Sequence, residues 1–349
     1  MATRPGHVRI LSSLCRRGLA GTARRQPPPF PTVPSCPAPT CGCADTPVLP
    51  AGLEIDGTSP LGGAMAGYAE QVLVCTGRDD WASRIEDESG GDNLAADLKE
   101  LFGRGGLYSD PFHKISILNS SFPSSAPPRA EVESTSAYLL PSFKYVPFLP
   151  RVSFDSVQAL AKGYLLPEKL HSAHSWLSPV HKDRLTRKDA YRSLLPGVQD
   201  VQDVLVLVCG HGGRDTRCGV FGPLLRHEFE DKLGRAGYEV ARRRARVADL
   251  READGEAQQA VDEPKKTARV GLVSHVGGHK FAGNVIIYLP PGHEGPEGEE
   301  HALAGCGIWY GRVEPRHVEG LVHETVVRGR VVEDMFRGGI DATRRVLRL

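Results

Sequence analysis

The sequence predicts an α/β fold, because short apolar strands ending in glycine-rich loops alternate with helical patterns. The clearest strand is Val204–Cys209 (VLVLVC), a β-branched apolar run followed by glycines. A helix is expected to begin at Gly222-Pro223 and to end at Gly237, since apolar residues between them recur at helical spacing. Further strands are expected at residues 270–274, 284–289 and 308–313 (the last strand), with a closing helix at 315–328. This order of strand, helix, strand, strand pair and helix is thioredoxin-like.

The N-terminal part carries a weaker copy of the same pattern. Strands are expected at residues 70–76 and 114–118, with further strand signal at 136–146, and a helix at 93–102. The segment VLVCTGRD (residues 72–79) resembles VLVCGHGGRD (residues 206–215), which suggests a degenerate internal repeat. Chance similarity of two short strands is the alternative. On either interpretation Cys75 is expected to be a buried thiol at a strand end.

Length and composition fit a protein of two domains. The chain has 349 residues, 40% of them hydrophobic, and a formal net charge of +1. No apolar run is long enough to span a bilayer, and the charge gives no sign of a nucleic-acid binder. We expect a leader and linker at 1–35, a degenerate thioredoxin-like domain at 36–150, a connecting region at 151–199 and a thioredoxin-like domain at 200–349.

The first 44 residues contain six arginines and no acidic residue. Serine and threonine are interspersed, and Ile10, Leu11, Leu14 and Leu19 could form an apolar stripe on a helix. This composition is typical of a mitochondrial transit peptide, which the membrane potential draws inward. A disordered basic tail is the alternative. A proline-rich stretch, residues 27–39, follows as a linker.

Two glycine-rich loops carry a set of four metal-ligating residues. Cys209 and Cys218 lie on the loop after the strand 204–209, and His275 and His279 lie in an H-x3-H spacing after the strand 270–274. Strand ends of this kind are where α/β sheets place ligands. Two thiolates and two imidazoles suit a soft or borderline metal centre.

Three motifs resemble the sucrase/ferredoxin-like family. They are CGHGGRDTRCG (residues 209–219), HVGGHKFAGN (275–284) and GIWYGRV (307–313), so that the resemblance is strongest over residues 200–330. It implies a thioredoxin-like ferredoxin domain with a [2Fe-2S] cluster. By motif position, Cys209 and Cys218 bind one iron and His275 and His279 bind the other.

Neutral histidines change the charge of such a cluster. Two thiolates and two imidazoles leave an oxidised cluster with no net charge, where four thiolates would give −2, so its reduction potential is expected to be high. Reduction is expected to be coupled to protonation of the histidines. Arg214 and Arg217 could offset charge or donate hydrogen bonds, with a structural salt bridge as the alternative. His211 is assigned to the loop and not to the ligands.

Further cysteines lie outside this set. Cys36, Cys41 and Cys43 lie within eight residues and are candidate redox thiols, with three reduced thiols on a flexible segment as the alternative. Cys306, just before the strand 308–313, is expected to be a buried thiol. The cysteines are not spaced as a disulfide framework.

Together these features predict a mitochondrial electron carrier of the [2Fe-2S] class that acts in thiol redox control. Its expected partners are redox proteins and the iron–sulfur assembly machinery, in the matrix or the intermembrane space. No residue set indicates a classical enzyme. Two alternatives are a zinc-binding structural or interaction module, since two cysteines and two histidines also bind zinc, and a thiol-disulfide oxidoreductase using Cys36, Cys41 and Cys43.

Overall fold

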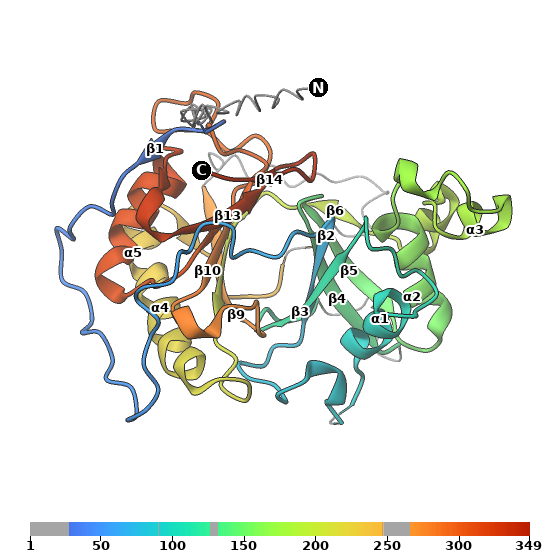
Figure 1. Ribbon diagram of the computed structural model, residues 1–349, viewed down its shortest axis with the longest axis horizontal. Coiled ribbons are helices and arrows are strands. Elements are labelled where there is room, and N and C mark those ends of the chain that lie inside the picture. The colour runs from blue at the N-terminus through green and yellow to red at the C-terminus, as the bar shows by residue number, and fades with distance from the viewer. Residues whose placement is uncertain (1–27, 90, 126–131, 246, 248–265) are drawn as a thin grey trace, which may run out of the picture.

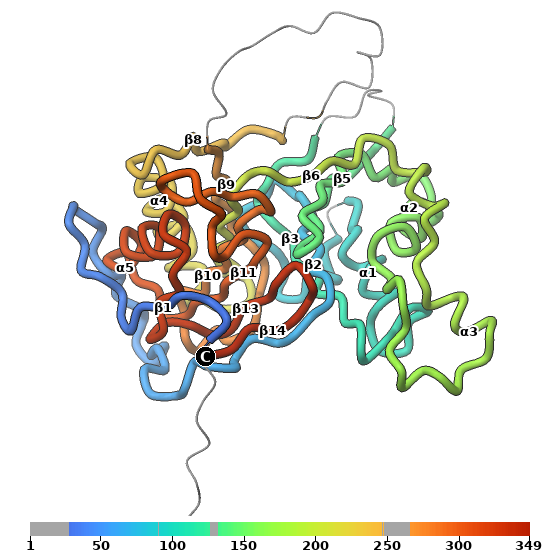
Figure 2. The backbone as a smooth tube through the Cα atoms, turned by 90° about the horizontal axis from the view of Figure 1, so that it is seen from above, coloured from blue at the N-terminus to red at the C-terminus, as the bar shows by residue number. Residues whose placement is uncertain are grey.

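The computed structural model describes residues 28–89, 91–125, 132–245, 247 and 266–349. The predicted transit peptide lies almost wholly outside these ranges, as do Cys15 and most of the charged segment 242–266. The described chain is a mixed α/β structure built on one large sheet, with helices packed against it (Figures 1 and 2).

The large sheet has twelve strands in the order β14-β13-β11-β10-β7-β9-β3-β2-β4-β5-β6, with β8 paired to β9. A separate two-stranded pair joins β1 and β12. The strands are β1 (Thr32–Val33), β2 (Glu70–Cys75), β3 (Ile115–Ser120), β4 (Ser134–Leu140), β5 (Lys144–Pro150), β6 (Gln199–Asp200), β7 (Val204–Cys209), β8 (Glu239–Val240), β9 (Thr267–Val273), β10 (Val285–Tyr288), β11 (Gly307–Tyr310), β12 (Val331–Val332), β13 (Phe336–Ile340) and β14 (Val346–Leu347).

Helices pack around this sheet, α4 and α5 beside its C-terminal strands and α1 and α2 beside its N-terminal ones (Figure 1). The α-helices are α1 (Leu94–Phe102), α2 (Phe154–Leu160), α3 (Pro179–Arg184), α4 (Thr216–Arg235) and α5 (Pro315–Leu321). Short 3₁₀ and π turns complete the described elements: η1 (Ile85–Asp87), η2 (Ala161–Leu165), η3 (Ser172–His174), η4 (Asp189–Leu194), η5 (His279–Phe281), η6 (Val322–Val327) and η7 (Glu333–Met335).

The two halves of the sheet share one topology. In the C-terminal half β7 runs parallel to β9 and antiparallel to β10, which is antiparallel to β11. In the N-terminal half β2 runs parallel to β3 and antiparallel to β4, which is antiparallel to β5. In each half a helix, α4 or α1, connects the two parallel strands. The two segments that suggested an internal repeat therefore occupy equivalent strands, β2 and β7. The domain boundaries stay a prediction.

The halves join where β3 lies beside β9. Ser120 pairs with Val273, and the Ser121 amide donates to the Leu272 carbonyl at 2.9 Å. The Ser274 amide donates to the carbonyl of Asn119 at 2.9 Å. The sheet is therefore continuous from one half to the other, and the ends of β9 and β3 are fixed against each other.

Strand β7 is buried on both faces. Val204, Val206 and Val208 belong to the larger hydrophobic cluster, which also contains Phe229 and Leu233 of α4. Leu205 and Leu207 belong to a second cluster on the opposite face. A strand covered on both sides has a continuous apolar sequence without alternation, which explains the run VLVLVC.

Helix α4 begins at Thr216, six residues before the predicted start at Gly222. The Asp215 side chain accepts a hydrogen bond from the Arg217 amide at 3.0 Å and caps the helix. Pro223 therefore lies inside the helix. The residue four positions before it, whose carbonyl the proline ring approaches, is Gly219. The prediction that Cys218 lies on a loop is wrong: it lies in the first turn of α4.

The prediction that residues 308–313 form the last strand is also wrong. Three strands follow, and two of them, β13 and β14, extend the sheet. The sequence of β13, FRGGI, contains two glycines and an arginine, which are residues that disfavour a strand in isolation. Packing overrides this preference. Met65 lies so close to Gly338 that a Cβ at position 338 would be 2.9 Å from the Met65 side chain, so only glycine fits there.

Two other expected elements are divided in the structure. The strand signal at 136–146 belongs to a hairpin of β4 and β5. The closing helix changes from α5 into the π turn η6 at Val322. Among the described residues, no helix is both long and apolar enough to cross a membrane.

Candidate functional site

Cys209 and Cys218 lie against each other at the end of β7. Cys209 is the last residue of the strand and Cys218 lies in the first turn of α4; the two residues are 2% and 1% exposed. Glycines permit this close approach: a Cβ on Gly222 would lie 2.5 Å from the Cα of Gly210, and one on Gly219 would lie 2.8 Å from the Cα of Gly212. The glycine-rich loop therefore lets the helix carry its cysteine to the strand end.

The two thiols shift each other's pKa in opposite directions. A hydrogen bond from Cys218, together with contacts to His275 and the Val276 amide, lowers the pKa of Cys209 well below its usual range. That same hydrogen bond, together with burial, raises the pKa of Cys218. Of the pair, Cys209 is the sulfur prepared to be a thiolate, and thiolates are the form in which cysteine binds metals.

The two predicted histidine ligands lie on a tight loop after β9. Gly277 and Gly278 separate them and take φ angles of 82° and 71°, which glycine adopts without strain. The His275 and His279 ring centroids are 5.2 Å apart. The Nδ1 atoms of both rings are buried and have no hydrogen-bond partner among the described residues.

The structure thus brings all four predicted ligands together. Cys209 contacts both Cys218 and His275, and the His275 ring lies beside the His279 ring. The described residues contain no group of three or more His, Cys, Asp and Glu side chains arranged to hold a metal ion. The arrangement is better described as a pair of sulfurs next to a pair of imidazoles than as four donors around one point.

His211 positions the histidine loop and is not free to bind a metal. Its Nδ1 accepts a hydrogen bond from the His275 amide at 3.0 Å. Its Nε2 lies 2.9 Å from the carbonyl oxygen of Ala82 and 3.2 Å from that of Trp81, so it donates to them. Both ring nitrogens are therefore occupied, as the assignment of His211 to the loop requires.

Arg337 is a buried cation that the sequence reasoning missed. It lies on β13 and is 1% exposed. Its guanidinium donates to Asn284 Oδ1 at 2.7 Å and to the carbonyls of Gly277 at 3.2 Å and Ala64 at 3.0 Å. Burial lowers its pKa to about 10, and the two thiols Cys209 and Cys218 oppose this by favouring the charged form. The only feature of the sequence that could have indicated this burial is that Arg337 stands between an apolar residue and glycines, in a segment where no strand was expected.

The two arginines singled out in the sequence have different roles. Arg217 makes the structural salt bridge: its Nε and Nη2 contact both oxygens of Asp215 at 3.0 and 2.9 Å. This pair lowers the pKa of Asp215, to which His279 also contributes. Arg214 is exposed, and its Nη1 lies 3.5 Å from Ser83 Oγ.

A cavity of about 340 Å³ opens beside His275. It lies between the two halves of the chain, with residues 83–86, Lys99 and Ile117 on one side and His211, Arg214, Ser274 and His275 on the other. The candidate site is therefore reached from the side of His275, while Cys209 and Cys218 are buried.

The N-terminal cysteines lie elsewhere, on a segment that crosses α4 and α5. The Thr40 and Cys41 amides donate to Glu319, and Lys232 donates to the Gly42 carbonyl at 2.7 Å. Burial raises the pKa of Cys36 to about 12. None of the described cysteines forms a disulfide, and this includes Cys41, Cys43 and Cys306. Glu319 of α5 and Lys232 of α4 hydrogen-bond to the described part of this segment, and a redox role for its thiols stays a prediction.

A family model described as sucrase/ferredoxin-like matches residues 61–338, which includes every residue of the candidate site. The chain belongs to the sucrase/ferredoxin-like family. The resemblance drawn from the three motifs is thereby confirmed. The match also extends through the N-terminal half, where the motifs were weak.

Curated proteins that share one name are similar to this chain, two of them over most of their length. Altered inheritance of mitochondria protein 32 of Meyerozyma guilliermondii is 28% identical over 320 residues, which covers 88% of this chain and 95% of that protein. The protein of the same name from Debaryomyces hansenii is 28% identical over 306 residues, covering 86% and 93%. That from Clavispora lusitaniae is 38% identical over 134 residues, or 38% and 34% of the two chains. No solved structure matches the chain.

Proposed function

We propose that this protein is a mitochondrial electron carrier with a [2Fe-2S] cluster held by Cys209, Cys218, His275 and His279. The observation that carries the proposal is the arrangement of these side chains as two adjacent pairs. The Cys209 and Cys218 sulfurs are hydrogen-bonded to each other, and both histidine Nδ1 atoms are buried without a hydrogen-bond partner among the described residues. An unsatisfied buried nitrogen is costly, and a metal would satisfy it.

The donor set fits a two-iron cluster better than a single zinc ion. A structural zinc site needs four donors around one point, whereas a two-iron cluster needs two protein donors at each of two metals. The described residues offer two pairs and no group of three around one ion. When bound, such a cluster supplies one-electron transfer.

The surrounding residues would tune and protect that chemistry. Cys209 and Cys218 are buried at the end of β7 and the start of α4, while His275 lines the cavity of about 340 Å³. Arg337 is a buried cation, and Cys209 and Cys218 lie close enough to it to favour its charged form. Together with neutral imidazole ligands, this charge would favour the reduced state and raise the potential.

The topology supports the thioredoxin-like interpretation of both halves. In each half the first strand is parallel to one neighbour and antiparallel to the other, and a helix connects the parallel pair. We infer that the N-terminal half is a repeat that lacks the ligands, since Cys75 is its only counterpart of the four.

A mitochondrial location rests on two observations. The first 44 residues have six arginines and no acid, and the relatives are named for inheritance of mitochondria. A reporter fused behind residues 1–40 is expected to enter mitochondria and to stay outside when the six arginines are changed to glutamine. Equal import of both fusions would contradict the transit peptide.

The N-terminal thiols receive less support as a redox centre. Burial raises the pKa of Cys36, and the Cys41 sulfur lies 3.3 Å from a carboxylate oxygen of Glu319. Burial therefore disfavours the reactive thiolate form of Cys36.

The proposal is tested by the colour and metal content of the protein. Freshly purified protein is expected to absorb above about 400 nm and to contain iron and acid-labile sulfide in equal amounts. Cys209→Ser and Cys218→Ser should each lose both, whereas the matched control Cys306→Ser should keep them. A colourless protein with bound zinc, or a Cys209→Ser variant with full iron and sulfide, would overturn the proposal.

A further inference from the structure

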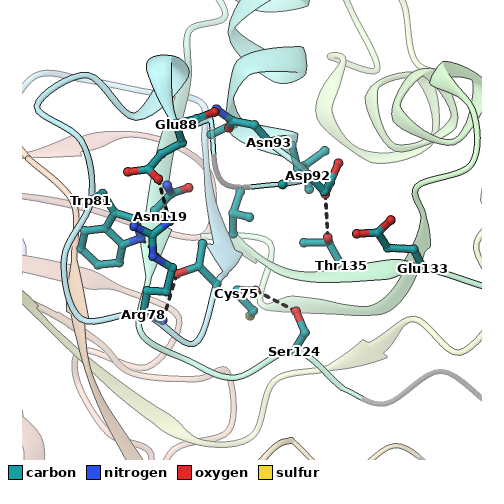
Figure 3. A pocket seen from close by; sticks show the side chains of 15 residues that line it. Cys75, Arg78, Trp81, Glu88, Asp92, Asn93, Asn119, Ser124, Glu133 and Thr135 are labelled. Atoms are coloured by element: carbon teal, nitrogen blue, oxygen red, sulfur yellow. Dashed lines mark hydrogen bonds and ion pairs between the residues drawn. The ribbon is translucent and has the colours of Figure 1, made fainter. Parts of the chain in front are cut away.

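A second cavity lies in the N-terminal half at the place that corresponds to the candidate metal site. Its volume is about 330 Å³, and it is formed at the ends of β2 and β3 beside the first turn of α1 (Figure 3). Cys75 of β2 lines it, as Cys209 of β7 forms the candidate site in the other half. The lining also includes Trp81, Asn119, Glu133, Asp92 and Arg78.

The cavity exists because the two halves differ in one connection. In the C-terminal half, residues 210–215 join β7 to α4, and glycines allow the helix to close against the loop. In the N-terminal half, residues 76–93 join β2 to α1, and this longer segment passes around the space instead of filling it. Trp81 on this segment is fixed by a hydrogen bond from its Nε1 to Thr76 Oγ1 at 3.0 Å.

Asn119 places an unsatisfied acceptor at this cavity. The residue is 4% exposed, and its Oδ1 is buried without a hydrogen-bond partner among the described residues. Its backbone is held rigidly, because its amide donates to Ser274 Oγ at 3.0 Å and its carbonyl accepts from the Ser274 amide. A buried acceptor left unpaired costs about 1–3 kcal/mol, so the site favours a ligand that supplies a donor.

One carboxylate of the wall, that of the exposed Glu133, has no ion-pair partner among the described residues. Arg78 pairs with Glu88 at 2.6 Å, and Asp92 is held by Arg151 at 2.7 Å. Glu133 makes no ion pair or side-chain hydrogen bond with the described residues. In Figure 3, Glu133 lies on one side of the cavity and Asn119, with Trp81, lies on the other.

We propose that this cavity binds a short organic cation with hydrogen-bond donors at both ends, of the alkyl diamine or aminoalkylguanidine class. One end would donate to Asn119 Oδ1, and the other would pair with the Glu133 carboxylate. The end bound to Asn119 would lie on the side of the cavity where Trp81 lies, and the alkyl body would span the cavity towards Glu133. The volume lies at the lower end of ordinary ligand pockets, which suits so small a molecule.

Calorimetry of the full-length protein with agmatine and 1,4-diaminobutane tests this proposal. Both are expected to bind, whereas succinate, of similar length and opposite charge, is not. Asn119→Leu and Glu133→Gln should each weaken binding by about tenfold or more, as loss of one charge-assisted hydrogen bond requires. Glu100→Gln, which removes the same charge from an exposed position on α1, should leave the affinity unchanged.

A further variant tests the proposal independently, in case the Asn119→Leu protein does not fold. Ala95 is buried in the first turn of α1 and lines the cavity, so Ala95→Met should occupy the space and abolish binding. Binding should persist in Cys209→Ser, because the cavity does not depend on the proposed cluster. The proposal fails if neither cation binds at millimolar concentration, if succinate binds equally well, or if Glu133→Gln and Ala95→Met both bind as tightly as the unmodified protein.

Discussion

The Nδ1 atom of His211 accepts a hydrogen bond from the backbone nitrogen of His275 at 3.0 Å. Because its Nε2 donates to the carbonyls of Trp81 and Ala82, this one imidazole joins the N-terminal half to the histidine loop. The Trp81 ring also meets the His211 ring edge-on, with centroids 5.8 Å apart. The position of the proposed ligand His275 is thus set, through His211, by two residues that lie about 130 positions before His211 in the chain.

Replacing His211 by alanine should loosen the histidine loop without removing a ligand. Two carbonyls and one amide lose their buried partner, so we expect a loss of about 2–4 kcal/mol in the free energy of unfolding. Iron content should fall only in part, unlike in Cys209→Ser. Urea unfolding and iron analysis measure both effects, with the exposed His227→Ala as control. Unchanged stability in His211→Ala would show that this connection is not needed.

The two glycines of the histidine loop should differ in their tolerance of a side chain. Both have positive φ, so alanine is strained at either position by about 1 kcal/mol. At Gly278 a Cβ would also lie 2.6 Å from Nη2 of Arg337, whereas nothing lies within 4 Å at Gly277. Urea denaturation should therefore show a larger loss for Gly278→Ala than for Gly277→Ala. Equal losses would mean that the guanidinium moves aside freely.

Arg337→Met should be strongly destabilising although it preserves much of the side-chain volume. The change leaves Asn284 Oδ1 and the carbonyls of Gly277 and Ala64 without their donors, at a cost of about 3 kcal/mol or more. If the cluster assembles, its midpoint potential should fall, because a nearby positive charge is lost. Thermal unfolding and voltammetry test this. The exposed Arg345→Met should change neither quantity substantially.

A pair of buried histidines should make the protein sensitive to acid. Burial, with repulsion from His293, lowers the pKa of His301 from 6.5 to about 4. The unfolded chain therefore takes up a proton at higher pH than the folded protein does, so stability should fall as pH decreases from about 6.5 towards 4. Urea midpoints across this interval should decrease less steeply for His301→Phe than for the unmodified protein or for His227→Phe. Parallel pH profiles would contradict the lowered pKa.

Short-range patterns in the sequence were sufficient for much of this architecture. Five apolar residues before Cys209 predicted β7 to the residue, because a strand buried on both faces tolerates no polar side chain. The four candidate ligands were found from their spacing after two strands, and the structure brings them together. The start of α4 was misplaced by six residues, because Pro223 was taken as a helix start when the capping Asp215 was the true signal.

Only the tertiary structure decided the contacts between segments that are distant in the chain. Nothing local to β13 marks Arg337 as a buried cation, since its partners Ala64, Gly277 and Asn284 come from three other segments. The unpaired Oδ1 atom of Asn119 and the role of His211 likewise depend on where β3 meets β9 and where residues 76–93 pass. The sequence by itself determined which residues carry thiols and imidazoles and which strands are buried, because these depend on residue type and period. The packing of the two halves decides which neighbours position those side chains, which charges lie near them, and which of their atoms lack a hydrogen-bond partner. No short-range pattern records these contacts.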